Sequence, residues 1–352
     1  MKKILYTLFT VSLLAMGCTQ EIPVSRDHDI NAEVIELETN MEMKTLYCNL
    51  NEAPALDLQK LGEYLTAQSV DVAMFVAPTE VAGENFKNWL EAYAKAQEKD
   101  GVPTLNLLTA QNNDGELIMA ALVNAEIAAE RYNIPQGRTL KNAVLHFKAN
   151  GVHFVVTDML VARNTMPIDW EDQVAEMTTN KKKVPLVYDP DVLSERKSEL
   201  LYIIKQTCDN SEFIKDAHWM WAIDMNAESS LDITKYHRDF LRIDCYDAED
   251  DFDWDAFYAK KTAYFTPLSE YIDATDPYFG LNDVMLYNNM IDCMAVYHSV
   301  YTPSSIDQTR RNFMYVSDKC WNLFHTFDLD TAIAADMGIA HYPIIVSLKR
   351  EE

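Results

Sequence analysis

Residues 219–228 decide the fold, and they read Trp-Met-Trp-Ala-Ile-Asp-Met-Asn-Ala-Glu. The apolar run predicts a buried strand that ends in a polar pair. Because alternate side chains of a strand share a face, Asp224 and Asn226 are expected to project together from the strand end. Such a pair suits a carboxylate that acts as a base or ligand beside an amide that orients a phosphate or a water. Asp-x-Asn is also a turn pattern, since these side chains bond to nearby backbone, so two interpretations stay open.

The N-terminus has the features of a bacterial secretion signal. Two lysines precede a short apolar run over residues 4–16, which is too short to span a bilayer. Residues 15–18 read Ala-Met-Gly-Cys and resemble a lipobox, in which Cys18 is cut free and acylated. We therefore expect a signal peptide over 1–17, a polar flexible tether over 18–40 and one folded domain over 41–352. Cleavage near Gly17 without lipidation is the alternative. A lipid anchor at Cys18 predicts attachment to a membrane of the cell envelope, the outer membrane of a Gram-negative bacterium.

Composition limits the partners. The 352 residues are 48% hydrophobic and 24% charged, which is typical of a globular protein with a large core. The 55 acidic and 30 basic residues give a formal charge of −25, which repels phosphate backbones, so nucleic acid is an unlikely partner. A small phosphate ester, a glycan and a protein remain as candidate ligands. Aromatic side chains cluster over residues 252–279. We expect them to pack helices together; an aromatic surface that binds a sugar is the alternative.

Periodicity predicts an α/β protein in layers. Helical spacing occupies residues 57–68, 84–99 and 193–208, while residues 117–132 fit a helix or a strand. Residues 140–148 and 152–159 are expected to form a hairpin. Further strands are expected at 43–50, 70–76, 104–108, 217–223, 312–316 and 342–349. Helices thus alternate with strands, but the hairpin argues against a purely parallel sheet.

The order of these segments resembles the endonuclease/exonuclease/phosphatase superfamily. That resemblance implies a DNase I-like four-layered α/β sandwich, in which two packed mixed sheets are flanked by helices. Each motif is weak alone, and their order carries the comparison over residues 43–349. The matching segments are Tyr-Cys-Asn-Leu at 47–50, Asp-Val-Ala-Met-Phe-Val-Ala at 71–77, Val-Val-Thr-Asp at 155–158, Ile-Asp-Met-Asn at 223–226, Arg-Arg-Asn-Phe-Met-Tyr at 310–315 and Ile-Ala-His-Tyr-Pro at 339–343.

The resemblance implies a role for each retained side chain. In the family a glutamate holds Mg²⁺, which polarises the phosphate. Asp224 corresponds to the residue that positions or deprotonates the attacking water. Asn49 and Asn226 correspond to amides that bond phosphate or water. His341 corresponds to the histidine that donates to the phosphoryl oxygen, with an aspartate elsewhere fixing its orientation; a buried histidine bonded to backbone is the alternative.

Several carboxylates of the pattern are replaced here. Ala77 stands in the place of the metal-binding glutamate, and Glu80 lies three residues on, where a shifted turn could restore it. Asp158 replaces the histidine of a Thr-His pair, Asn312 replaces an aspartate, and Ala340 replaces the aspartate before the final histidine. Glu80 and Asp158 are the remaining candidate metal ligands, and the loss of the other carboxylates argues against a Mg²⁺ site.

These replacements predict a degenerate domain that binds a ligand or partner without turnover, because losing one preorganised group costs orders of magnitude in rate. The alternative is an active Mg²⁺-dependent phosphodiesterase or phosphatase, a phosphoric ester hydrolase acting on a small or lipid-linked phosphate.

Overall fold

The computed structural model describes residues 42–53, 55–112, 115–134, 143–159, 190–208, 217–227, 229, 231, 280–298, 302–306 and 310–349. The expected signal peptide, Cys18, the tether and the aromatic cluster at 252–279 lie outside these residues. In the part that is described, no helix is both long enough and apolar enough to cross a bilayer.

The first sheet has six strands in the order β13-β14-β1-β2-β6-β5. Strands β1 and β2 run parallel, and the other neighbours are antiparallel. A hairpin of β3 (Glu80–Val81) and β4 (Glu84–Asn85) follows β2. The bounds are β1 (Glu42–Asn49), β2 (Val72–Pro78), β5 (Leu105–Gln111), β6 (Leu117–Asn124), β13 (Phe324–Leu329) and β14 (Ile344–Lys349).

The second sheet also has six strands, in the order β11-β12-β10-β9-β8-β7. Strands β9 and β10 run parallel, while β12 is antiparallel to β10. The expected hairpin is present as β8 and β9. The bounds are β7 (Ala129–Tyr132), β8 (Val144–Ala149), β9 (Val152–Asp158), β10 (His218–Asp224), β11 (Met290–Asp292) and β12 (Asn312–Ser317).

The two sheets pack face to face around one apolar core. Alternate residues of each central strand point inward, as a strand requires. On β9 these are Val152, Phe154 and Val156, and on β10 they are Met220 and Ala222. Residues of β1, β2 and β6 from the first sheet join the same cluster. The inward faces therefore form continuous apolar rows that run toward the strand ends.

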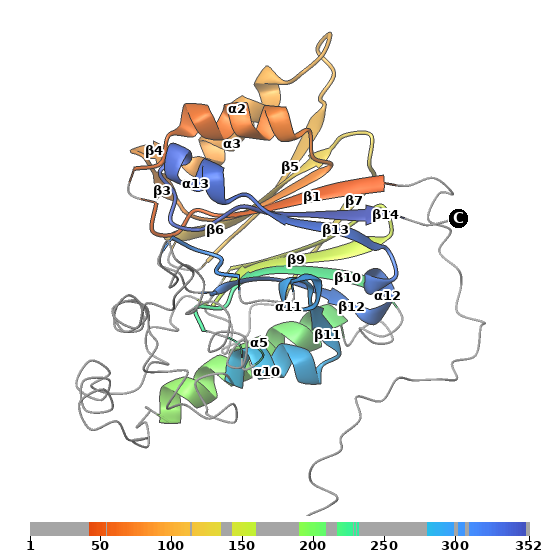
Figure 1. Ribbon diagram of the computed structural model, residues 1–352. Coiled ribbons are helices and arrows are strands. Elements are labelled where there is room, and N and C mark those ends of the chain that lie inside the picture. Colours follow the sequence, from red (N-terminus) through yellow and green to blue (C-terminus); the bar gives the residue numbers. More distant parts are fainter. Residues whose placement is uncertain are drawn as a thin grey trace, which may run out of the picture. The chain divides into compact units, whose positions relative to one another are not determined.

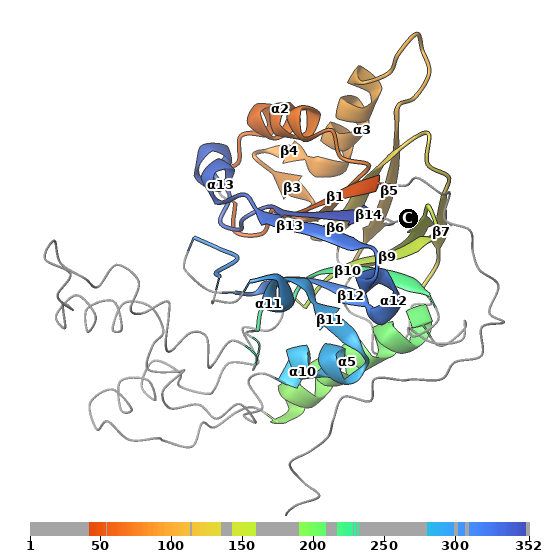
Figure 2. The ribbon, with the colours of Figure 1, turned by 45° about the vertical axis from the view of Figure 1, so that its right-hand side comes forward.

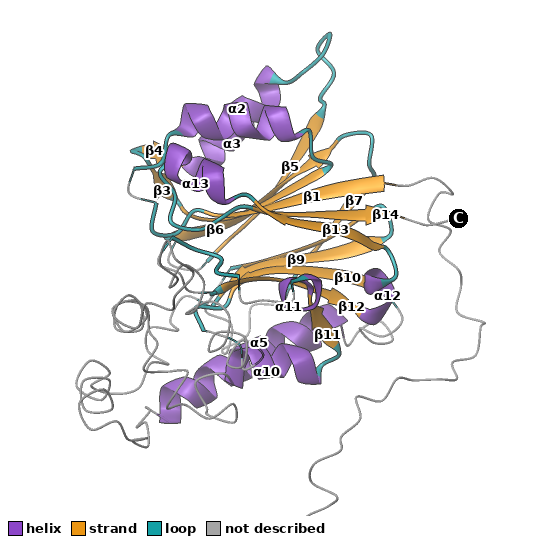
Figure 3. Cartoon of the chain, in the orientation of Figure 1, coloured by secondary structure: helices purple, strands orange, loops and turns teal. Residues whose placement is uncertain are grey.

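Helices cover both outer faces, which completes four layers (Figures 1 and 3). The first sheet is covered by α2 (Leu58–Gln68), α3 (Phe86–Ala96) and α13 (Thr331–Met337). The second sheet is covered by α5 (Pro190–Cys208) and α10 (Gly280–Tyr287), which lie side by side in both ribbon views (Figure 2). Two short helices, α11 (Cys293–Tyr297) and α12 (Asp318–Trp321), flank β12. The four-layered α/β sandwich expected from the sequence is confirmed.

The ambiguous segment 117–132 forms strands β6 and β7. Its alanines favour helix intrinsically, but β6 is inserted between β2 and β5 and is buried along nearly its whole length. Burial on both faces removes the alternation of polar and apolar residues that marks a strand, so tertiary packing overrides propensity here.

Candidate functional site

Four buried polar side chains meet where the inward apolar rows end. Strand register places Asp158, Asp224 and Asn312 side by side, at the ends of β9, β10 and the beginning of β12. Asn49 ends β1 of the opposing sheet and contacts this row. Their exposed fractions are only 0–2%. The alternation that buries the core therefore also delivers these groups to the space between the sheets.

Asn49 connects the two sheets. Its Nδ2 donates to Asp224 Oδ2 at 2.6 Å and to Asn312 Oδ1 at 2.6 Å. Its Oδ1 accepts from the backbone N–H of Asn51 at 2.9 Å. Both amide hydrogens and the carbonyl oxygen are thus engaged, as the burial of an amide requires. Asn49 and Asp224, to which the resemblance assigned separate roles, are thus in direct contact.

Two similar turns cover the buried carboxylates. The backbone N–H of Asn226 donates to Asp224 Oδ1 at 3.0 Å, as that of Asn51 does to Asn49. The side-chain amides of Asn226 and Asn51 then donate to Asp158 Oδ1 at 3.3 Å and Oδ2 at 2.5 Å. Asn226 adopts a left-handed conformation with φ 47°, which asparagine tolerates. Asp-x-Asn therefore forms a turn, and the side-chain amide of that turn also contacts the polar row at the strand ends.

The pKa of Asp158 depends on its surroundings. Burial raises the pKa of Asp158 well above its usual value, and the neighbouring charge of Asp224 raises it further. Hydrogen bonds from Asn51 and Asn226 and the charge of Arg196 act in the opposite direction. Two buried aspartates are thus kept together by amides that donate to all four of their oxygens.

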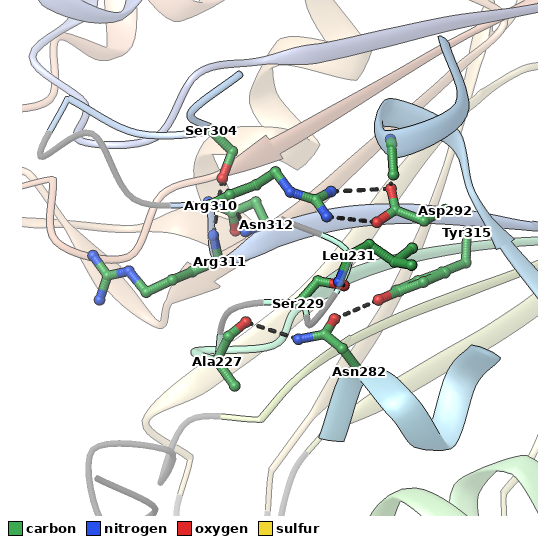
Figure 4. Close-up of polar contacts among 11 residues, drawn as sticks. Ala227, Ser229, Leu231, Asn282, Asp292, Ser304, Arg310, Arg311, Asn312 and Tyr315 are labelled. Atoms are coloured by element: carbon green, nitrogen blue, oxygen red, sulfur yellow. Dashed lines mark hydrogen bonds and ion pairs between the residues drawn. The ribbon is translucent and has the colours of Figure 1, made fainter. Parts of the chain in front are cut away.

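His341 joins the network through Asn312. The Nδ2 of Asn312 lies 2.7 Å from His341 Nδ1, and His341 as a whole is 2% exposed. The backbone of His341 forms a β-bridge with Ser305. Ser304 Oγ accepts the backbone N–H groups of Arg311 and Asn312 at 3.1 Å each, and so fixes the beginning of β12 (Figure 4).

Further buried polar contacts anchor the segments next to the network (Figure 4). Arg310 donates twice to Asp292, at 3.0 and 2.7 Å, and both side chains are 1% exposed. Asn282 of α10 donates to the carbonyl of Ala227 at 2.9 Å, and Tyr315 donates to Asn282. The turn after Asp224 is therefore tied to α10 as well as to the sheet.

The residues present do not fit the magnesium site that the resemblance implies. Ala77 points outward into the cluster under the helices, and the inward neighbour of Asn49 on β2 is the apolar Val76. Glu80 is exposed on β3, where it accepts from Asn85 at 3.4 Å. Within the described ranges, no three His, Cys, Asp or Glu side chains are grouped to hold a metal ion. Asp158 lies in the polar row, but Glu80 is outside the hydrogen bonds described for it.

Sequence reasoning missed Asn51 and Ser304. A signal for Asn51 was present, because Asn49-Leu50-Asn51 repeats the spacing of Asp224-Met225-Asn226. Ser304 carries no such signal, since it lies in an irregular segment whose place beside β12 depends on tertiary structure.

Comparison with known proteins identifies solved structures that share this fold. No protein-family model matches the sequence, and no curated protein is significantly similar to it. Among solved structures, an AP endonuclease from Archaeoglobus fulgidus aligns with a TM-score of 0.52 at 10% identity, over 86% of this chain and 98% of that one. An AP endonuclease from Leishmania major gives 0.51 at 13%, over 88% of each chain. A 3'-5' exonuclease from Neisseria meningitidis gives 0.51 at 12%, over 88% and 100%. The chain therefore has the DNase I-like fold of the endonuclease/exonuclease/phosphatase proteins.

Proposed function

We propose that this domain binds a small phosphate ester, a glycan or a protein ligand at the polar strand ends and does not turn it over. The observation that carries the proposal is the burial and hydrogen bonding of the two carboxylates. Asp158 and Asp224 are buried, and each of their oxygens already accepts a hydrogen from an asparagine amide or from backbone. A general base or a metal ligand must be reached by water or an ion. Each oxygen keeps a second lone pair, but both carboxylates are buried beneath Asn51 and Asn226, which restricts that access.

The groups nearest to solvent support a binding role. Asn51 and Asn226 are partly exposed, whereas the acids beneath them are 0% and 1% exposed. A ligand therefore meets amides, which donate and accept hydrogen bonds but transfer no protons. Asp224 and Asn49 then act by fixing these amides, and His341 by completing the network.

A hydrolysis assay with matched variants tests the proposal. The mature full-length protein in detergent is incubated with bis-p-nitrophenyl phosphate and p-nitrophenyl phosphate, in Mg²⁺, Mn²⁺ or EDTA. We expect no release of nitrophenolate above the blank. The active-phosphoesterase alternative prevails if hydrolysis appears and is abolished by EDTA and by Asp224→Asn, but not by Asp336→Asn. Asp336 is a suitable control because its carboxylate is 59% exposed in an ion pair with Lys60.

Binding is measured on the same protein. Titration with p-nitrophenyl phosphate, a model oligosaccharide or a candidate protein is followed through the side-chain amide NMR signals of Asn51 and Asn226. We expect saturable shifts of both signals with one of these probes. In Asn226→Ala, we expect the Asn51 signal to stop shifting.

We also propose that the chain is a lipoprotein of the cell envelope, anchored to the membrane through Cys18. The lipobox-like residues 15–18 support this. Metabolic labelling with a fatty acid tests it directly. Label is expected on the wild-type chain and not on Cys18→Ser, and labelling that persists in the variant contradicts the proposal.

A further inference from the structure

The direction of every hydrogen bond around Asn49 follows from one backbone group. The N–H of Asn51 can only donate, so the atom of Asn49 that faces it at 2.9 Å is Oδ1. The other end of the Asn49 side chain must then be Nδ2. Because a backbone N–H is always a donor, it determines which end of the Asn49 amide is oxygen.

This orientation determines that of Asn312. The two hydrogens of Asn49 Nδ2 are directed to Asp224 and Asn312, each at 2.6 Å. Asn312 must present its oxygen to Asn49, because two amide nitrogens repel at that distance. The Nδ2 of Asn312 consequently faces Nδ1 of His341 at 2.7 Å.

We infer that Asn312 is a positioning residue that holds His341 as a neutral ring, with its hydrogen on Nε2 and its lone pair on Nδ1. The inference rests on the proposed function and deepens it by assigning the form of the histidine in the same site. A second hydrogen on the ring would occupy Nδ1 and meet the N–H of Asn312 at 2.7 Å. The ring thus carries its one N–H at Nε2, where it can donate a hydrogen bond, and has no positive charge.

Among the residues that the structure describes, the charged groups with recorded contacts at this network are themselves paired. Asp224 is bonded to Asn49, so the described hydrogen bonds connect it to the ring through two amides. Arg310 is paired with Asp292, and Arg311 lies 3.6 Å from Glu52. Each of these charges has a partner of its own.

An aspartate at position 312, as in the pattern that the chain resembles, would have the opposite effect. A carboxylate accepts from Asn49 and also from a hydrogen on Nδ1 of the ring. It would also stabilise a doubly protonated, cationic ring, which can give a proton to an oxygen. Asparagine at 312 therefore changes the ring from a potential acid into a fixed hydrogen-bond donor, which agrees with a site that binds without turnover.

The tautomer can be measured directly. Mature full-length protein labelled with ¹⁵N-histidine is studied by long-range ¹H–¹⁵N correlation at neutral pH, and the ring signals of His341 are assigned by their loss in His341→Gln. We expect Nδ1 to resonate in the range of an unprotonated nitrogen and Nε2 in that of a protonated one. In Asn312→Asp, we expect Nδ1 to move to the protonated range. Asn85→Asp makes the same chemical change at the N-cap of α3, where aspartate is also favoured, and should leave the pattern as it is in the wild type.

Two outcomes overturn the inference. One is a hydrogen on Nδ1, or on both nitrogens, in the wild-type protein. The other is a folded Asn312→Asp variant whose ring signals match those of the wild type. If that variant does not fold, the wild-type spectrum decides alone. The spectrum needs no ligand or substrate, so a failure of the proposed function in the hydrolysis or binding assay is a separate result.

Discussion

Two regions of the inter-sheet space differ in chemistry. Strands β1, β9, β10 and β12 have apolar inward rows, and each row ends in a polar side chain. Along β10 the inward residues are Met220 and Ala222, and the next inward residue is Asp224. Along β9, Phe154 and Val156 are followed by Asp158. The apolar rows are stabilised by removal of surface from water, which is roughly proportional to area and not directional. The polar ends instead depend on the direction of each hydrogen bond. Substitutions should therefore reduce stability most in the rows, while at the ends their effects should depend on pH, backbone conformation and hydrogen-bond direction.

Removing a large side chain from an apolar row should have the largest effect. Phe154 is 0% exposed, and its ring stacks on Phe147 with centroids 5.0 Å apart. Phe154→Ala is expected to lower the free energy of unfolding by about 3–5 kcal/mol, because it removes buried area and leaves a cavity. Urea titration followed by circular dichroism measures this.

The matched control for that variant is Tyr287→Ala, which removes a side chain that is 79% exposed. It should change the free energy of unfolding by less than about 0.5 kcal/mol. A loss below about 1 kcal/mol in Phe154→Ala would contradict the assignment of the inter-sheet rows as the main source of stability.

A change at the polar end should appear as a pH dependence. Burial and the charge of Asp224 raise the pKa of Asp158, so the folded state keeps this proton to higher pH than the unfolded state, whose value is about 3.9. Wild-type stability therefore loses a contribution as pH rises from that value through the raised one. Asp158→Asn removes this titration. Its stability relative to the wild type should increase between about pH 4 and 7 by more than the roughly 0.5 kcal/mol typical of surface changes.

The comparison is made as a difference between two urea titrations at each pH, which cancels the contributions of carboxylates that titrate alike in both proteins. Asp336→Asn serves as the exposed control and should show a flat difference. A difference for Asp158→Asn that is flat, or that falls as pH rises, would show that Asp158 is not held protonated by its surroundings.

Much of the apolar half could be predicted from sequence, because alternation and helical spacing record which face is buried. Strands β1, β2, β9, β10, β12 and β14 were all expected close to their observed positions. The order of motifs led to Asn49, Asp224 and Asn226 as candidate site residues, and the hydrogen bonds link Asp224 to both asparagines. Strand β13 was missed because it is an edge strand with mostly exposed or half-buried residues, which weakens the apolar alternation. Helix α10 was missed because it packs on α5, which is distant in sequence.

The chemistry of the site was harder to predict than its location. That Asp158 would accept from both Asn51 and Asn226 depends on side-chain direction within an ångström or two. Sequence spacing specifies a face but not such contacts. Asn312 illustrates the limit, since its replacement of an aspartate is visible in the sequence while its effect on His341 requires the direction of two hydrogen bonds.

The smallest effect should separate backbone from side chain at Asn226. This residue has φ 47°, and its amide donates to Asp158 at 3.3 Å. Glycine adopts that conformation freely, whereas alanine is strained there by about 1–2 kcal/mol. We expect Asn226→Gly to be more stable than Asn226→Ala by about 1 kcal/mol in urea titrations. Both variants lack the amide, so both should lose the binding response to the same extent. Equal stabilities would mean that the turn does not require a left-handed residue. Retained binding in the glycine variant would mean that the backbone, and not the amide, forms the polar end of β10.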